Sequence, residues 1–298
     1  DLTKSGRGTL ILEGTNLAGG GARRTVLNEG VLEIADLDAI GGDTGALIFA
    51  GGTLRFGAGF ADDLFGRTIA ILEGGMGLDT NGVNQTITTA LGTGVGRIAK
   101  YGLGDLTLDA AVSNGGPVLV AGGKLVFGVP GALANGWDLQ LGEGVTTGSL
   151  DLGSSDFTVT ALSALANNAS ASVLTVAPGR VLRVEGDIVL SNRTDAGRTL
   201  LTIEGGGGLV VQAASIVVGL NAAGNNFSSS AFLDLSGLAS FSAELSTRLA
   251  INAQSDNSAA DFGVLTLSAG PNFISAPSIL IGASGAGSLT NALRLGPS

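Results

Sequence analysis

Short runs of alternating apolar and polar residues recur along the whole chain, separated by small, turn-forming residues. Typical runs are Thr9–Leu12, Val31–Ile34 and Thr53–Phe56, each preceded by a glycine and lying between clusters of Gly, Asn, Asp or Ser. A two-residue period of this kind predicts β-strands that bury one face. Helical spacing is scarce, and the weak pattern over 156–171 contains adjacent asparagines, so we expect no stable helix there. The pattern therefore predicts an all-β protein.

Blocks of sequence also return in order at nearly constant spacing. The matching pairs are 4–12 with 100–108, 29–34 with 122–127, and 51–56 with 147–152. In the last third the repeat spacing is shorter, and the sequence of 214–219 returns at 277–282. Between these zones, 153–205 keeps the strand-and-turn texture without a clear repeat. Regular repeats of this kind indicate a repeat architecture rather than a globular domain.

A strand of four residues between glycine turns cannot bury a core alone. Coiled into rungs of roughly 20–25 residues, such strands pair with equivalents above and below, about 4.8 Å apart. We therefore predict a right-handed parallel β-helix, with 1–152 and 153–298 as two repeat zones of one continuous elongated domain. The side chains expected to face inward are Leu10, Leu12, Leu32, Ile34, Leu54 and Phe56. An antiparallel sandwich is the alternative, but it favours more aromatic residues and tight two-residue hairpins than this chain has.

Composition narrows the chemistry further. The chain has no His and no Cys, which excludes serine-type triads, His-ligated metals and thiolate zinc sites. Its net charge of −10 argues against nucleic acid as a partner. The chain contains no run of about 18 consecutive apolar residues, so we predict no transmembrane helix. The chain starts and stops inside patterned sequence, so we expect a piece of a longer secreted protein.

Parallel β-helices also carry polysaccharide-degrading enzymes, so clustered carboxylates need attention. The candidates are Asp36, Asp38, Asp43, Asp62 and Asp63, the last two near Arg67. Sugar stacking would need aromatic platforms, and the chain has one Trp and one Tyr, Trp137 and Tyr101, far apart in sequence. Solvated carboxylates on turns are the better interpretation. We therefore predict no catalytic residue, no enzyme activity and no cofactor.

Residues 74–79 match once the G-G-x-G-x-D hexad of calcium-binding solenoids. One copy is insufficient, because such sites take ligands from consecutive turns. The run of four glycines at 205–208 lacks the Lys-Ser/Thr of a phosphate loop and predicts a flexible corner. We therefore predict no metal site, and interpret Asp79 as a turn residue beside Asn81.

The repeated blocks resemble the autotransporter-associated β-strand repeat, also called the passenger-associated transport repeat. Lys4–Leu12 is similar to its K-x-G-x-G-T-L-x-L start, and Thr25–Ile34 to its continuation. Gly51–Phe56 is similar to the later G-G-T-L strand, and 74–82 to the G-G-x-x-D-T-N-G segment before Lys100 restarts the series. The resemblance covers about 1–152. It implies a right-handed β-helix in the passenger region of a large bacterial surface or secreted protein, with a role in export and display.

Three functions remain open at this point. The first is a structural passenger stalk or adhesin-like scaffold, secreted or on the bacterial cell surface. The second is a self-assembling subunit of an extracellular filament or sheath, and the third, least favoured, is a polysaccharide-degrading enzyme. Partners that fit the first two are other copies of the chain, bound end to end or laterally, and a surface glycan or a host or neighbouring cell.

Overall fold

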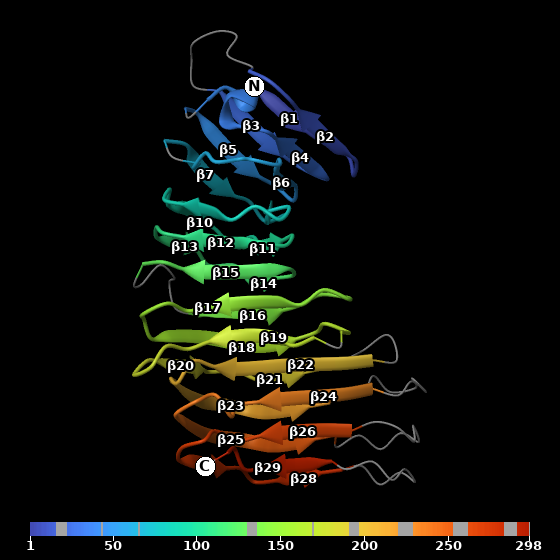
Figure 1. Ribbon diagram of the computed structural model, residues 1–298, viewed down its shortest axis with the longest axis vertical. Helices are drawn as coiled ribbons and strands as arrows, with labels where there is room; N and C mark the ends of the chain where they lie inside the picture. The colour runs from blue at the N-terminus through green and yellow to red at the C-terminus, as the bar shows by residue number, and fades with distance from the viewer. Residues whose placement is uncertain are drawn as a thin grey trace. The chain divides into compact units, whose positions relative to one another are not determined.

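The structure, a computed structural model, describes residues 1–15, 23–42, 44–64, 66–129, 136–168, 170–190, 197–219, 229–252, 262–282 and 291–297. Nearly all regular structure is β-strand (Figure 1). Neighbouring strands in the stacked sheets run parallel, as for β2 with β4 and β23 with β25. The predicted all-β parallel β-helix is confirmed. Contacts divide the chain into two compact units, Asp1–Trp137 (unit 1) and Asp138–Ser298 (unit 2).

Unit 1 contains three sheets. Sheet A consists, in order, of β1 (Leu2–Lys4), β3 (Arg24–Leu27), β5 (Ala46–Phe49), β7 (Thr68–Ile71), β10 (Leu91–Gly94) and β13 (Val112–Asn114). Sheet B consists of β2 (Thr9–Leu12), β4 (Val31–Ile34), β6 (Thr53–Phe56), β8 (Met76–Asp79), β11 (Ile98–Tyr101) and β14 (Val118–Val120). Sheet C consists of β9 (Gln85–Ile87), β12 (Asp105–Leu108) and β15 (Gly123–Phe127). The chain visits A, B and, from β9 on, C in each turn, so successive turns form rungs 1 to 6.

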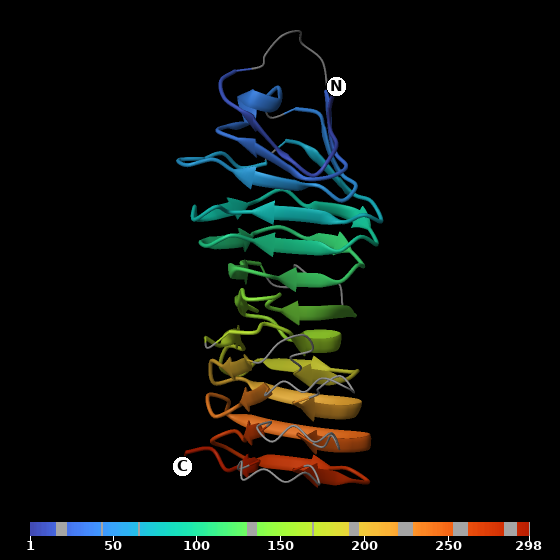
Figure 2. The same cartoon turned by 90° about the vertical axis from the view of Figure 1, so that its right-hand side faces the viewer.

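Unit 2 is built from two sheets of the same kind (Figure 2). Sheet D consists of β16 (Trp137–Leu141), β18 (Phe157–Ala164), β20 (Val181–Val184), β23 (Gly208–Val218), β25 (Ser240–Ile251) and β27 (Asn272–Ser275), with β21 (Ile188–Leu190) and β28 (Ile279–Ile281) alongside the longer strands. Sheet E consists of β17 (Gly148–Asp151), β19 (Ser172–Thr175), β22 (Gly197–Glu204), β24 (Ser229–Asp234), β26 (Phe262–Thr266) and β29 (Ala292–Arg294). The segment 156–171, for which no helix was expected, supplies β18.

Ladders of inward-facing side chains form the core. Four of the six predicted inward residues, Leu32, Ile34, Leu54 and Phe56, have no exposed surface. Leu10 and Leu12 are half-buried because β2 is the first strand of sheet B and has a neighbour on one side. Ile11 between them is 55% exposed, so the predicted alternation holds in β2 as well.

The repeats have a structural meaning that the sequence did not reveal. Residues 4–12 span the corner between sheets A and B, whereas their copy at 100–108 spans the corner between B and C. The copy of β4 is likewise β15, in sheet C. The distance between copies therefore combines four turns of the coil with one step to the next face. In unit 2, Ile216, Leu249 and Ile279 are aligned neighbours, so the return of 214–219 at 277–282 spans two turns.

Two expectations about size were wrong for part of the chain. In the later part of unit 2, Leu201 pairs with Leu233 and Leu233 with Leu265, so these rungs are longer than predicted, whereas the rung from Ser149 to Val173 has the predicted length. Longer strands contribute to this: β23 has 11 residues and β25 has 12, whereas strands of about four residues were expected. The boundary predicted at 152 and the single continuous domain remain predictions.

Candidate functional site

The carboxylates considered for catalysis bind backbone amides at turns. Asp36 accepts a hydrogen bond from the amide of Ala39 at 3.0 Å and caps a four-residue 3₁₀ helix, Leu37–Ile40. Asp62, one turn further on, accepts from the amide of Leu37 at 2.8 Å. Both side chains therefore satisfy donors at the start of a short helix, where a carboxylate is a favoured cap.

The other members of this group also have structural partners or face solvent. Asp63 accepts hydrogen bonds from the amide and the hydroxyl of Thr88. The Arg67 guanidinium is buried and donates to backbone carbonyls across the turn. Asp38 is exposed on the 3₁₀ helix, and Asp43 lies outside the described residues. Among the described residues, these carboxylates cap turns or face solvent, and no two of them share a hydrogen-bond donor.

Asp79, from the single calcium-like hexad, already has a cationic partner. Its carboxylate accepts from Arg55 Nε at 2.8 Å and from the amide of Asn81 at 2.9 Å. Asn81 adopts the left-handed conformation, with φ 51°, that asparagine tolerates. Over the described ranges, no three His, Cys, Asp or Glu side chains gather as a metal cluster.

We therefore expect metal removal to leave stability unchanged. Thermal unfolding with and without a chelator should give midpoints within about 2 °C of each other, since Asp79 is held by a guanidinium. A drop of more than about 5 °C, on the order of 1–2 kcal/mol for a chain of this size, would contradict this expectation.

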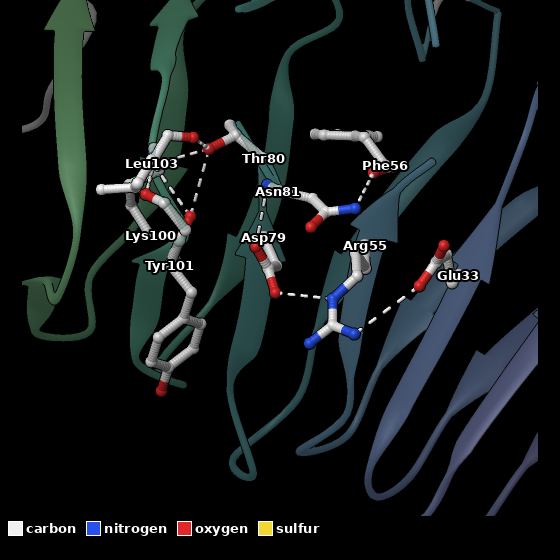
Figure 3. Close-up of polar contacts among 10 residues, drawn as sticks. Glu33, Arg55, Phe56, Asp79, Thr80, Asn81, Lys100, Tyr101 and Leu103 are labelled. Carbon is white, nitrogen blue, oxygen red and sulfur yellow. Dashed lines mark hydrogen bonds and ion pairs between the residues drawn. The ribbon is translucent and has the colours of Figure 1, made fainter. Parts of the chain in front are cut away.

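A column of charged side chains runs across the outer face of sheet B (Figure 3). Glu33, Arg55 and Asp79 occupy aligned positions on β4, β6 and β8. Arg55 Nη1 lies 3.6 Å from Glu33 Oε2, and Arg55 Nε lies 2.8 Å from Asp79 Oδ2. The hydrogen bond to Asp79 is the main cause that raises the pKa of Arg55 above its usual value. Each pair contributes on the order of 0.5–1 kcal/mol, and the two pairs together connect three rungs.

The repeated lysines sit where apolar side chains are expected. Lys100 aligns with Leu78 on one side and with Val120 on the other, and it is 1% exposed. Its ammonium donates to Thr80 Oγ1 at 2.9 Å, to the carbonyls of Tyr101 and Gly102 at 2.8 Å each, and to that of Gly122 at 3.0 Å. These acceptors belong to rungs 4, 5 and 6, so one side chain joins three turns.

Lys4 makes equivalent contacts in rung 1, at the corner between sheets A and B. It is 6% exposed and donates to the carbonyls of Ser5 at 3.1 Å, of Gly6, and of Glu29 in the next rung at 3.0 Å. We call the two arrangements the lysine corners. The sequence had shown the lysine as part of a repeat, but its burial was missed. The available signal was Lys100 at an inward position of the apolar alternation, followed by Gly-x-Gly.

Burial lowers the pKa of Lys100 to about 8, and the charges of Asp79 and Asp105 oppose that shift. The folded state therefore holds the proton less tightly than the unfolded chain, whose lysine titrates near 10.5. Between pH 8 and 10.5 the unfolded state binds more protons, so the free energy of unfolding rises with pH.

We accordingly expect the free energy of unfolding of the unmodified protein to rise relative to Lys100→Met between about pH 8 and 10. Urea unfolding at each pH measures this difference. The control is Leu103→Met, at a position 75% exposed in the same corner, which should show no pH-dependent difference. If the free energy of unfolding of the unmodified protein minus that of Lys100→Met stayed constant or fell as the pH rose, the burial of a charged lysine would be contradicted.

Trp137 and Tyr101 do not form a sugar-stacking pair. Trp137 is buried, and Tyr101 is half-buried against a small apolar cluster of Ala99, Leu119 and Ala121.

In the described part of the chain, the single helical element is the 3₁₀ helix of four residues, too short to cross a membrane.

Comparison with known proteins gives one informative similarity. In an alignment 144 positions long that covers 44% of this chain, the chain is 35% identical to the adhesin BmaC autotransporter of Brucella suis biovar 1 (strain 1330). The aligned part is 4% of that adhesin, so the chain spans a small fraction of the relative. No family model and no solved structure matches the chain. The similarity supports the autotransporter resemblance in its general form, and no match tests the particular repeat family.

Proposed function

We propose that this chain is part of a bacterial surface protein, in which its rungs serve as a passenger stalk or adhesin-like scaffold. The observation that carries the proposal is the 35% identity to part of an autotransporter adhesin. A coil of parallel rungs supports it, because inward side chains hold the shape while outward positions remain free to contact other molecules. The acidic composition, with a net charge of −10, favours solubility of a long particle. The proposed role involves no catalysis.

Labelling of intact cells tests the location that this function requires. An antibody raised against residues 1–298 should label unpermeabilised cells of the source bacterium, because the scaffold is displayed outside. An antibody against a periplasmic protein is the control and should label permeabilised cells alone. Labelling by the first antibody that also requires permeabilisation would contradict the proposal.

Self-association is a second candidate, favoured by one observation. Ile279, Leu280 and Ile281 on β28 are 49%, 41% and 45% exposed, and Phe273 on β27 is 55% exposed. Exposed apolar strands of this kind can pair with another chain. Sedimentation velocity over a range of concentrations tests this candidate, and a monomer at every concentration would exclude it.

A further inference from the structure

We infer that the lysine corners fix the register of the coil, so that each selects one alignment of its rung with the next. The inference concerns how the fold is specified and is independent of the proposed function. It rests on the geometry of Lys4 and Lys100 and on the spacing of the rungs around them.

Apolar ladders alone specify this register weakly. Leu106 and Leu108 of β12 face Leu125 and Phe127 of β15. A slip of two residues keeps the inward side chains inward and places Leu108 against Leu125 or, in the other direction, Leu106 against Phe127, whereas a slip of one residue reverses the faces. Two-residue slips are therefore the errors that hydrophobic burial penalises least.

Rung length does not remove the ambiguity. Along one ladder of sheet B, the aligned residues are Leu54, Leu78, Lys100 and Val120. Each interval in this series is two residues shorter than the one before it, so the chain tolerates changes of two residues from one turn to the next. Lys100 begins the shortest interval of the series.

A buried ammonium distinguishes these alignments because it needs acceptors at fixed places. In the observed register, Lys100 donates to the carbonyl of Gly122, just before β15, and to two carbonyls of its own corner. It also donates to Thr80 Oγ1 in the preceding rung (Figure 3). A slipped rung would move the Gly122 carbonyl and leave a buried charge with fewer partners, which is costly. Buried polar groups that fix register at some cost in stability are known from coiled coils.

Gly123 in the next rung further favours the observed register, because a residue with a Cβ does not fit at its position. A Cβ on Gly123 would lie 2.4 Å from the carbonyl oxygen of Gly104 and 2.8 Å from Lys100 Nζ. A two-residue slip would bring Ala121 or Leu125 to that place, and both carry a Cβ. The same arrangement recurs at Gly30, whose Cβ would lie 2.4 Å from the Gly6 carbonyl oxygen and 2.8 Å from Lys4 Nζ. Two independent copies of one geometry support a common role.

Disulfide trapping in the full chain measures the register directly, since the protein has no cysteine of its own. The pair Thr107→Cys with Val126→Cys reports the observed register, in which these outward residues are aligned. The pair Thr107→Cys with Lys124→Cys reports a two-residue slip. In the observed register these two positions are diagonal, with Cα atoms about 7–8 Å apart, which is beyond disulfide reach, whereas the slip would align them. With Lys100 present, the first pair should cross-link and the second should not.

In the Lys100→Met background, cross-linking of the slipped pair should rise at least about tenfold relative to the aligned pair, equivalent to ~1.4 kcal/mol of register preference. Leu103→Met is the matched control and should leave the ratio unchanged. An unchanged ratio in folded Lys100→Met protein would overturn the inference, whatever its stability.

If Lys100→Met does not fold, Lys4→Met decides, because it acts on a terminal rung that the remaining stack does not need. The reporters are Ile11→Cys with Glu33→Cys for the observed register, and Ile11→Cys with Val31→Cys for the slip. A shift toward the slipped pair supports the inference, and an unchanged ratio overturns it.

Discussion

Replacing Leu106 with Asp should destabilise the protein by about 5 kcal/mol, enough to unfold the surrounding rungs. Leu106 is 1% exposed and lies in a ladder between Gln85 and Leu125. The Gln85 amide already donates to the backbone carbonyls of Asp62 and Thr86, so the new carboxylate gains no established donor from it. Urea unfolding followed by circular dichroism measures the loss.

The adjacent substitution Thr107→Asp is the control. Thr107 is half-exposed on the outer face of the same strand, and its change should cost about 1 kcal/mol or less, including repulsion from Asp105. The large difference between neighbouring positions follows from the two-residue period of a strand. Similar losses for both variants would mean that the assigned faces of β12 are wrong.

Gly123→Ala should have the second largest effect, about 3 kcal/mol or more. Gly123 has φ +61°, and its Cβ would meet the carbonyl oxygens of Gly104 and Gly102 at 2.4 and 2.7 Å. The cost therefore combines a left-handed backbone with a collision against backbone that cannot move without displacing the neighbouring rung.

Gly144→Ala separates these two causes. Gly144 has φ +58°, nearly the same as Gly123, but a Cβ there would meet nothing within 4 Å. Its replacement should cost about 1 kcal/mol, the penalty of the backbone conformation alone. Chemical denaturation of both variants gives the comparison, and equal losses would show that the corner at Gly123 is looser than described.

The fold could be predicted because strand alternation and glycine spacing act locally. The ladder positions Leu32, Ile34, Leu54 and Phe56 follow directly from the period of two, and all four are fully buried. The step of the long repeat from one face of the coil to the next was not predictable, because it depends on turn lengths that accumulate over four rungs. The long strands β23 and β25 were missed because the sequence breaks their pattern, as at the register shift between Ala213 and Ser215.

The polar interactions were predicted less well than the core. Asp36 and Asp62 lie on turns as expected. The backbone amide that Asp62 binds, however, belongs to the preceding rung and could not be predicted without knowing which rungs are neighbours. The charged column of Glu33, Arg55 and Asp79 joins residues that are each one rung apart, so it becomes visible only when the rung length is known. Lys100 was misleading for another reason, since a lysine is expected at the surface unless its ammonium finds several acceptors.

Deletion of one rung tests most directly the central claim that equivalent stacked rungs hold the shape of this scaffold. Leu10, Leu32 and Leu54 are aligned in successive rungs at equal spacing along the chain, so deleting 32–53 joins two rungs in register. The shortened protein should keep its β-sheet circular dichroism, with a cooperative unfolding midpoint within about 5 °C of the full chain. Deleting 32–42, half a rung, should abolish cooperative unfolding because it moves the following strands out of alignment. Equal damage from the two deletions, or tolerance of both, would contradict a stack of equivalent rungs.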